Sequence, residues 1–280
     1  MKKIAIITGA SSGFGLLTTI ELAKKDYTVI ATMRDLNKQE NLLSQAAALH
    51  LQHHIKIHQL DVTDPNSIHT FQLFLRELDQ VDLLINNAGY ASGGFVEDIP
   101  IEEYRKQFET NVFGAISITQ IVLPYMRKQK SGKIMNVSSI SGQIGFPGLS
   151  PYVSSKHALE GWSESLRLEV KQFGIDVCLI EPGSYNTNIW EVGKSLAKQY
   201  SENTSPYIEY MQKIQQHINN GSDTFGNPID VAKKIVAVAE AKKTSFRYPI
   251  GKGVKLMMTV KKLIPWKWWG FLVHKNFKRM

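Results

Sequence analysis

The sequence predicts an α/β fold in which helices cover both faces of a single doubly wound, parallel sheet. Apolar, β-branched segments alternate with helix-like segments along most of the 280 residues. The apolar segments are nearly continuous, which is typical of strands that are buried on both faces. The polar motifs of the chain directly follow these segments, at the strand ends where such sheets bind their ligands. We therefore expect a Rossmann-type domain with about seven strands.

The N-terminal half of the chain predicts strands and helices in strict alternation. The strands are short apolar runs rich in β-branched residues, at 3–8, 27–33, 55–62 and 81–89. Each is followed by a helical pattern, at 13–25, 37–49, 65–77 and 101–128. This order is that of parallel strands joined by crossover helices.

The C-terminal half continues the alternation and then departs from it. A strand at 132–139 and a strand at 174–183 flank a helix that contains Tyr152. Polar, loosely helical sequence follows near 187–227, before a helix at 228–242 and a strand at 246–250. No linker, internal repeat or low-complexity tract divides the chain. Residues 1–250 are thus predicted to form one domain, followed by an extension at 251–280.

Composition excludes several classes of protein. No apolar stretch is long enough to cross a bilayer, and the first apolar run passes directly into a glycine turn, unlike a signal peptide. The single cysteine, Cys178, excludes an intrachain disulfide and a cysteine-based metal site. The histidines at 50–58 lack converging acidic residues, so no metal site is expected. These features indicate a cytoplasmic protein.

The net charge of +8 is concentrated in the extension. From Lys252 onward there is no acidic residue, and the basic residues account for the whole surplus: Lys252, Lys255, Lys261, Lys262, Lys267, Lys275, Lys278 and Arg279. A nucleic-acid partner is therefore not expected. Apolar residues at helical spacing and three tryptophans accompany the lysines. We favour packing of this extension on the domain or at a subunit interface, and contact with an anionic membrane is the alternative.

The segment TGASSGFG joins the first strand to the first helix and contains Gly9, Gly13 and Gly15. Glycines permit a tight turn, and the N-terminus of a helix offers free N–H groups to a pyrophosphate. The spacing differs from the common dinucleotide motif G-x-G-x-x-G. A nucleotide-binding turn is the preferred interpretation, with a turn of no function as the alternative.

Tyr152 precedes Lys156 by four residues, and nothing between them breaks a helix, so both side chains share one face. Tyr248 and Lys252 have the same spacing, but the proline and glycine between them forbid a regular helix. An ordinary tyrosine has a pKa of about 10 and is a poor base at neutral pH. A nearby ammonium group favours the phenolate. We therefore expect Tyr152 to act as a base in oxidation and as an acid in reduction.

Together these motifs resemble the short-chain dehydrogenase/reductase family. The resemblance extends over residues 1 to about 250 and also includes DVTD, NNAG, ETNVFG, NVSS and the PG after the sixth strand. The segments ATMRDL and FGLL are similar to those of steroid and retinol dehydrogenases and related bacterial oxidoreductases. The resemblance implies a nicotinamide cofactor, a substrate lid at about 187–227, and a homodimer or homotetramer.

The end of the second strand bears on the choice of cofactor. NAD-selective folds place an acidic residue there, whereas this chain has Met33 and Arg34, and an arginine binds a 2′-phosphate. We predict NADP(H), with NAD(H) as the alternative if Arg34 pairs with Asp35 or stacks on adenine. Asp61 is also read as a helix cap. The resemblance and the glycine turn together assign the cofactor to Gly9, Ser11, Ser12, Gly13, Phe14, Gly15, Arg34, Asp61, Val62, Asn87, Ala88, Gly89, Tyr152, Lys156, Pro182, Gly183 and Thr187.

The resemblance also implies a catalytic set of Asn111, Ser139, Tyr152 and Lys156. Ser139 would polarise the substrate oxygen, and strand alternation lets only Ser139 or its neighbour Ser138 face the cleft. Asn111 would perturb its helix to hold a proton-relay water, and its alternative is a helix-surface position. The residues predicted to contact a hydrophobic substrate, or alternatively to pack in the core or at a subunit contact, are Tyr90, Phe95, Ile144, Phe146 and Tyr185.

The sequence thus predicts an NADP(H)-dependent oxidoreductase that interconverts a hydrophobic alcohol and its ketone or aldehyde. A non-catalytic NADP(H)-binding sensor or scaffold is the alternative from another class. A sensor has no need of a proton-transfer group such as Tyr152, which favours the enzyme.

Overall fold

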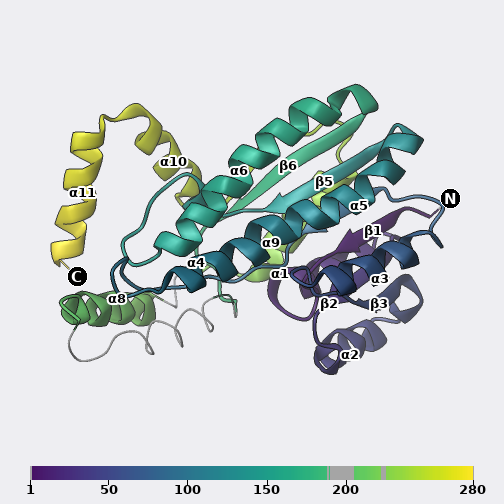
Figure 1. Cartoon of the computed structure of the whole chain (residues 1–280), viewed down its shortest axis with the longest axis horizontal. Coiled ribbons are helices and arrows are strands. Elements are labelled where there is room, and N and C mark those ends of the chain that lie inside the picture. The colour runs from purple at the N-terminus through teal and green to yellow at the C-terminus, as the bar shows by residue number, and fades with distance from the viewer. Residues whose placement is uncertain (1, 188, 190–204, 222–224, 280) are drawn as a thin grey trace.

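The computed structural model describes residues 2–187, 189, 205–221 and 225–279. Its centre is one parallel sheet of seven strands in the order β3-β2-β1-β4-β5-β6-β7 (Figure 1). The strands are β1 (Ile4–Ile7), β2 (Thr28–Met33), β3 (Ile55–Gln59), β4 (Leu83–Asn86), β5 (Gly132–Val137), β6 (Ile175–Pro182) and β7 (Arg247–Ile250). The predicted doubly wound fold is confirmed.

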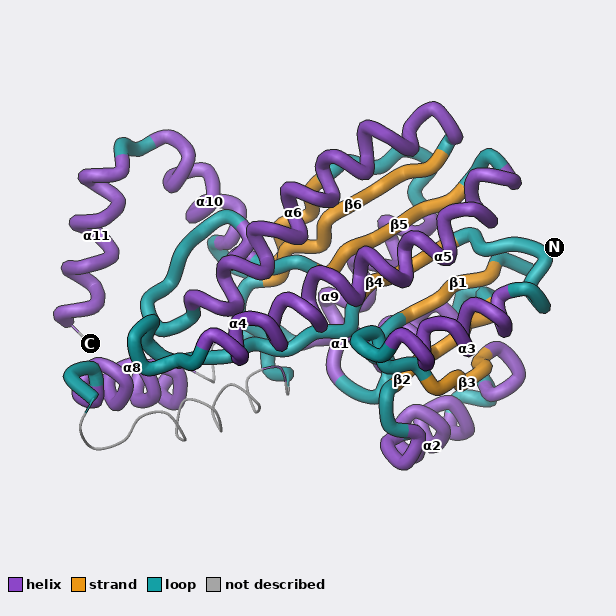
Figure 2. The backbone as a smooth tube through the Cα atoms, in the orientation of Figure 1, coloured by secondary structure: helices purple, strands orange, loops and turns teal. Residues whose placement is uncertain are grey.

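Helices cover both faces of the sheet (Figure 2). Around the sheet they are α1 (Gly13–Ala23), α2 (Glu40–Ala48), α3 (Pro65–Leu75), α4 (Ile101–Phe108), α5 (Gly114–Gln129), α6 (Ser150–Val170) and α9 (Pro228–Glu240). Short 3₁₀ turns lie at Leu36–Lys38, Gln52–His54, Ile140–Gly142 and Lys171–Phe173. One long helix predicted at 101–128 is divided into α4 and α5 by a π-helical turn at Glu109–Phe113.

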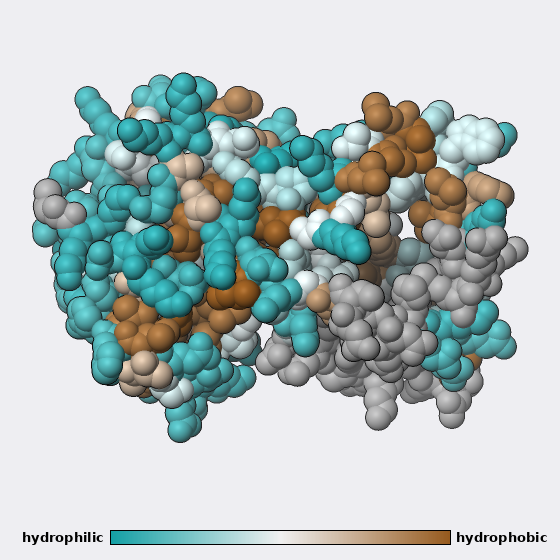
Figure 3. All heavy atoms as spheres, turned by 180° about the vertical axis from the view of Figure 1, so that it is seen from behind, coloured by the Kyte–Doolittle hydropathy of each residue, from teal (hydrophilic) through white to brown (hydrophobic). Residues whose placement is uncertain are grey.

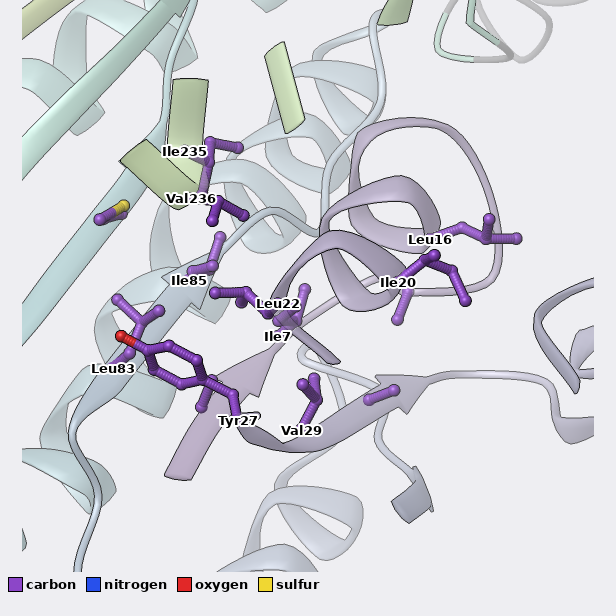
Figure 4. Close-up of a cluster of buried hydrophobic side chains, with 14 of the residues drawn as sticks. Ile7, Leu16, Ile20, Leu22, Tyr27, Val29, Leu83, Ile85, Ile235 and Val236 are labelled. Carbon is purple, nitrogen blue, oxygen red and sulfur yellow. The ribbon is translucent and has the colours of Figure 1, made fainter. Parts of the chain in front are cut away.

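Two hydrophobic clusters sandwich the sheet, because successive strand residues point to opposite faces. Ile7 of β1 packs with α1, α2 and α9, and this cluster is drawn in Figure 4. Its neighbour Ile6 packs on the other side with α3, α5 and α6. Burial on both faces explains why the strand sequences are apolar without alternation.

The segment predicted to be a lid lies partly outside the described residues, which omit 188, 190–204 and 222–224. Within it the structure describes α8 (Ile208–Gly221). The C-terminal extension forms α10 (Val254–Leu263) and α11 (Trp266–Arg279), separated at Pro265. Val254, Met258 and Trp269 pack on Ile144 in a third, small cluster. Among the described residues, no helix is both long enough and apolar enough to cross a membrane.

Replacing Phe71 by alanine should lower the free energy of unfolding by about 3 to 5 kcal/mol, because the fully buried ring of α3 leaves a cavity. Leu73→Ala, on the same helix but 42% exposed, should change it by less than about 0.5 kcal/mol. Urea unfolding followed by circular dichroism measures both values. Equal losses would contradict the assignment of these two residues to opposite sides of α3.

Candidate active site

A cleft of about 850 Å³ lies at the carboxyl ends of the strands. It spans the point where β1 and β4 are neighbours, at which the strand order reverses direction. Most of the predicted residues line it: Gly9, Ser11, Ser12, Gly13, Phe14, Arg34, Asp61, Val62, Asn87, Ala88, Gly89, Tyr90, Ser139, Tyr152, Lys156, Pro182, Gly183, Tyr185 and Thr187. Gly15, Phe95, Asn111, Ile144 and Phe146 are not among the residues that line it.

The glycine turn forms the wall of the cleft between β1 and α1. Gly9 has a φ of +70°, a conformation that disfavours any residue with a side chain. A Cβ at this position would also lie 2.9 Å from the Ala88 Cα, which is too close. Gly15 faces inward, where a Cβ would collide with the Gly9 carbonyl oxygen. Ser12 is the N-cap residue of α1, and its side chain makes no capping hydrogen bond. The start of α1 therefore presents backbone N–H groups to an anionic ligand.

Thr8, the first residue of the segment TGASSGFG but not one of the predicted site residues, ties this turn to the end of β4. Its Oγ1 accepts hydrogen bonds from the backbone N–H groups of Asn87 and Ala88, each at 3.0 Å. The Asn87 side-chain amide donates in return to the carbonyls of Thr8 (2.9 Å) and Gly9 (3.0 Å). Asn87 thus holds two loops of the cleft in register. A threonine directly before the glycine motif was the available signal.

Arg34 and Asp61 face each other at the end of the cleft that is expected to hold the adenosine of the cofactor. The Arg34 Nε lies 4.0 Å from an Asp61 carboxylate oxygen, and 75% of the Arg34 side chain is exposed. Asp35 caps the following turn through the Asn37 N–H, so the predicted alternative of an Arg34–Asp35 pair is not what the structure shows. Asp64, rather than Asp61, caps α3.

Tyr152 and Lys156 lie on the same face of α6 at the floor of the cleft. Their side chains are nearly inaccessible, with Tyr152 3% and Lys156 5% exposed. The Lys156 Nζ lies 5.7 Å from the centre of the Tyr152 ring and donates a 2.7 Å hydrogen bond to the Val137 carbonyl at the end of β5. The lysine is thus fixed beside the phenol by the sheet itself.

Burial dominates the protonation of both groups. It raises the pKa of Tyr152 to about 12. A hydrogen bond with Ser139 lowers this pKa, but by less than burial raises it. Burial lowers the pKa of Lys156 to about 8, although the charge of Glu160 opposes this shift. The sequence had predicted that the ammonium lowers the tyrosine pKa. In the structure desolvation is the largest cause of both shifts, because removing water disfavours the charged form of each group.

Ser138 and Ser139 both line the cleft, although strand alternation predicted only one. The prediction fails because β5 ends at Val137, so the serines follow the strand rather than continue it. Their roles differ: the Ser138 hydroxyl donates to Glu160 at 2.8 Å, whereas Ser139 contacts Tyr152 and accepts from the Ser141 N–H at 3.1 Å. Ser139 is the serine placed to contact a substrate oxygen beside Tyr152.

Asn111 sits in the π-helical turn and is buried, so the alternative of a helix-surface position is wrong. Its Oδ1 accepts from the Tyr90 N–H at 3.2 Å, and its Nδ2 donates to the Tyr90 carbonyl at 3.0 Å. A further 3.2 Å bond reaches the Ser155 hydroxyl on α6. Asn111 therefore joins the α4–α5 junction to α6 and to the loop after β4, just behind the residues that line the cleft.

A buried ionic cluster behind Lys156 was not predicted. Glu160, one turn after Lys156, is paired with Arg247 of β7, which also binds Glu181 at 2.8 Å. Ser138 and Gln143 donate hydrogen bonds to Glu160 as well. Burial and the charge of Glu160 raise the pKa of Glu181 to about 7. One guanidinium thus pairs with two carboxylates under the catalytic helix, and because a single positive charge cannot balance both, Glu181 holds its proton more tightly than an ordinary glutamate.

The predicted substrate residues are divided by the structure. Tyr90 and Tyr185 line the cleft, but Phe95 stacks on Tyr207 with ring centres 4.4 Å apart. Ile144 and Phe146 pack with the C-terminal extension. Burial by that extension, which follows them by about a hundred residues, left no signal in the local sequence.

Charged and polar side chains of α4 and the π-helical turn also line the cleft, and the sequence analysis, which considered apolar residues for the substrate, did not predict them. They are Glu103, Lys106, Glu109 and Thr110.

Comparison with known proteins agrees with this geometry. A family model described as short chain dehydrogenase matches residues 3–197. The oxidoreductase YusZ of Bacillus subtilis is 51% identical over 98% of both chains. The 3-ketodihydrosphingosine reductase of Bacteroides thetaiotaomicron is 34% identical over 93% of this chain and 92% of its own length. Human retinol dehydrogenase 8 is 39% identical over 70% of this chain and 62% of its own.

Solved structures show the same architecture. A short-chain dehydrogenase from Streptomyces avermitilis superposes with a TM-score of 0.79 at 33% identity, covering 93% of this chain and 92% of that one. ElxO with NADP bound gives a TM-score of 0.74 at 26% identity, covering 91% of this chain and all of the other. A Burkholderia phymatum protein in complex with NAD, at 22% identity and a TM-score of 0.76, covers 92% of each chain and shows the shared fold.

Arg247→Met should lower the free energy of unfolding by about 3 to 5 kcal/mol near pH 8, because it leaves Glu160 and Glu181 buried without a cation. The pKa of Glu181 is already raised to about 7. The folded variant therefore binds protons more tightly than the unfolded chain, and acidification from pH 8 toward pH 5 should recover part of the loss. Urea unfolding at both pH values measures this.

Arg105→Met is the matched control, because Arg105 forms an exposed pair with Glu102 on α4. It should change the free energy of unfolding by less than about 1 kcal/mol at either pH. A loss for Arg247→Met that is independent of pH would show that the carboxylates are not what the guanidinium stabilises.

Proposed function

Since the chain belongs to the short-chain dehydrogenase/reductase family and is an NAD(P)-dependent enzyme, we propose that it interconverts a hydrophobic alcohol and its ketone or aldehyde with NADP(H). The observation that carries this proposal is the convergence of Ser139, Tyr152 and Lys156 on one floor of a nucleotide-sized cleft. A proton donor and a cation fixed beside it are what carbonyl reduction requires.

The cleft suits a dinucleotide in its shape and in its donors. The glycine turn and the open start of α1 would hold the pyrophosphate, and Lys156 the nicotinamide ribose. The bound cofactor supplies or accepts the hydride, which is chemistry that no side chain provides. Asn87, through its bonds to the glycine turn, keeps that wall of the cleft in place.

Each catalytic side chain has a distinct task in this proposal. Ser139 donates a hydrogen bond to the substrate oxygen, and Tyr152 gives its phenolic proton to that oxygen during reduction. A tyrosine with a pKa of about 12 holds its proton at neutral pH, so it is ready as an acid. In oxidation the phenolate must form, and the charge of protonated Lys156 then offsets the cost of burying it.

Selectivity for NADP(H) rests on Arg34. It lines the cleft at the end of β2 and is mostly exposed, so its guanidinium is accessible to a ribose 2′-phosphate. No acidic residue occupies the end of β2, where one would repel that phosphate, although Asp61 lies nearby on the next loop. ElxO, which has NADP bound in its solved structure, supports the same choice.

The substrate is proposed to be hydrophobic because related proteins are named for such reactions. One is a 3-ketodihydrosphingosine reductase, and another is a dehydrogenase of retinol, which is an apolar alcohol. Tyr90 and Tyr185 supply aromatic surface in the cleft. Lys106 and Glu103, which pair at 2.8 Å, lie at the same wall and are suited to a polar group on the substrate.

Tyr152→Phe should reduce the turnover number for carbonyl reduction by at least about 100-fold, because it removes the proton donor while keeping the ring. The dissociation constant for NADPH, measured by its fluorescence, should change by less than about threefold. Tyr248→Phe is the matched control, since Tyr248 also precedes a lysine by four residues but is not among the residues of the cleft. Turnover that survives in the Tyr152 variant would instead support a cofactor-binding sensor.

Arg34→Asp should lower kcat/KM with NADPH by roughly 10- to 100-fold and raise it with NADH, because an acidic side chain repels a 2′-phosphate and binds a free 2′-hydroxyl. Arg76→Asp, at the exposed end of α3, makes the same charge change outside the cleft and should leave the ratio of the two values unchanged. A native preference for NADH would overturn the assignment of NADP(H).

A further inference from the structure

The C-terminal extension exposes an unusual number of large apolar side chains. Its two helices form an arch beside the domain (Figure 1), and apolar residues gather at that end of the molecule in the space-filling view (Figure 3). Seven of them are between 42% and 77% exposed: Leu256, Met257, Leu263, Trp266, Trp268, Phe271 and Leu272. Single exposed apolar residues are ordinary, but seven on two consecutive helices indicate a contact surface.

In α10 the exposed and buried apolar residues lie on opposite faces. Val254 and Met258, one turn apart, pack against Ile144 on the domain. Leu256, Val260 and Leu263 recur at spacings of four and three residues, so they share the other face. Packing on the domain therefore uses only one side of the helix. The other side of α10 leaves Leu256 and Leu263 exposed.

In α11 the same division is present. Trp269 is buried with the small cluster, whereas Trp268, Phe271 and Leu272 are exposed at i, i+3 and i+4. The Lys275 Nζ lies 5.9 Å from the centre of the Phe271 ring, and Lys261 lies 4.6 Å from the Trp266 ring. Ammonium groups placed over exposed aromatic rings are typical of side chains that occupy a water–lipid boundary.

The charge of the extension identifies its partner. Residues 252–280 carry eight basic residues and no acidic one. A second copy of the same surface would bring two such positive charges together, which opposes self-association through this face. An anionic bilayer is attracted by every lysine near its surface and accepts tryptophan, phenylalanine and leucine into its headgroup boundary.

We propose that α10 and α11 form a docking surface for anionic membranes, with Leu256, Leu263, Trp268, Phe271 and Leu272 entering the lipid boundary and the lysines at the headgroups. The surface adjoins the cleft. Val254, the first residue of α10, packs so closely on Gly183 that a Cβ on this glycine would lie 2.6 Å from it, and Gly183 lines the cleft. Docking thus brings the cleft close to the bilayer, where the hydrophobic alcohols and ketones of the proposed function accumulate.

The test is co-sedimentation of the full chain with vesicles of phosphatidylcholine alone or mixed with phosphatidylglycerol at about 3:1. The wild type should bind the mixed vesicles at least about tenfold more tightly than the neutral ones, and about 0.5 M NaCl should remove most of this difference. Leu263→Ser with Trp268→Ser should weaken binding to mixed vesicles by roughly tenfold or more. This readout needs no cofactor, so it is independent of the proposed reaction.

Two further variants make the result specific. Leu43→Ser with Leu73→Ser removes two exposed leucines on α2 and α3 and should leave vesicle binding unchanged. Lys255→Gln with Lys262→Gln, both exposed, should weaken binding to mixed vesicles while the helices stay intact, which circular dichroism would verify.

Equal recovery of the wild type in the pellet with and without vesicles would overturn the proposal. Light scattering gives the molar mass in solution. If the wild type does not bind vesicles but has a larger mass than the Leu263→Ser, Trp268→Ser variant, the surface is an interface with a second copy instead.

Discussion

Lys156 must stay beside Tyr152 in a buried site, and a hydrogen bond to the Val137 carbonyl holds it there. This 2.7 Å hydrogen bond from the Lys156 Nζ joins the middle of α6 to the last residue of β5. Because this bond comes from the backbone of a central strand, the lysine position depends on the sheet rather than on a mobile loop. The orientation of Tyr152 one turn earlier on α6, and its contact with Ser139, follow from the same attachment.

A second group of residues keeps that attachment in place. Glu160 continues the face of α6 that carries Lys156, and Arg247 connects it to β7 at the far edge of the sheet. Ser138 hydrogen-bonds Glu160 while Ser139 faces Tyr152, so adjacent serines serve the ionic cluster and the cleft separately. Asn111 performs the corresponding task on the other side, from the π-helical turn to α6. The catalytic helix is therefore fixed from both sides by buried polar contacts, although Glu181 Oε2 in the ionic cluster is buried without a hydrogen-bond partner.

The fold and the glycine turn could be predicted because their signals are local: strand periodicity, and glycines between a strand and a helix. The ionic cluster could not, since Arg247 meets Glu160 across 87 residues and no spacing rule relates them. For Ile144 the sequence left substrate contact and core packing open, and the structure shows packing under the extension, because burial by a distant segment leaves no trace in the local sequence. The raised pKa of Tyr152 could not be predicted for a similar reason, because desolvation depends on the whole surrounding structure.

The central claim is that burial against the β5 carbonyl controls the charge of Lys156. It is tested most directly by an NMR titration of the lysine Nζ groups in the cofactor-free enzyme, with the Lys156 signal assigned by its absence in Lys156→Arg. The account predicts that Lys156 titrates with a pKa of about 8, well below the exposed lysines of the same chain. A Lys156 signal that titrates together with the exposed lysines, near pH 10.4, would contradict it.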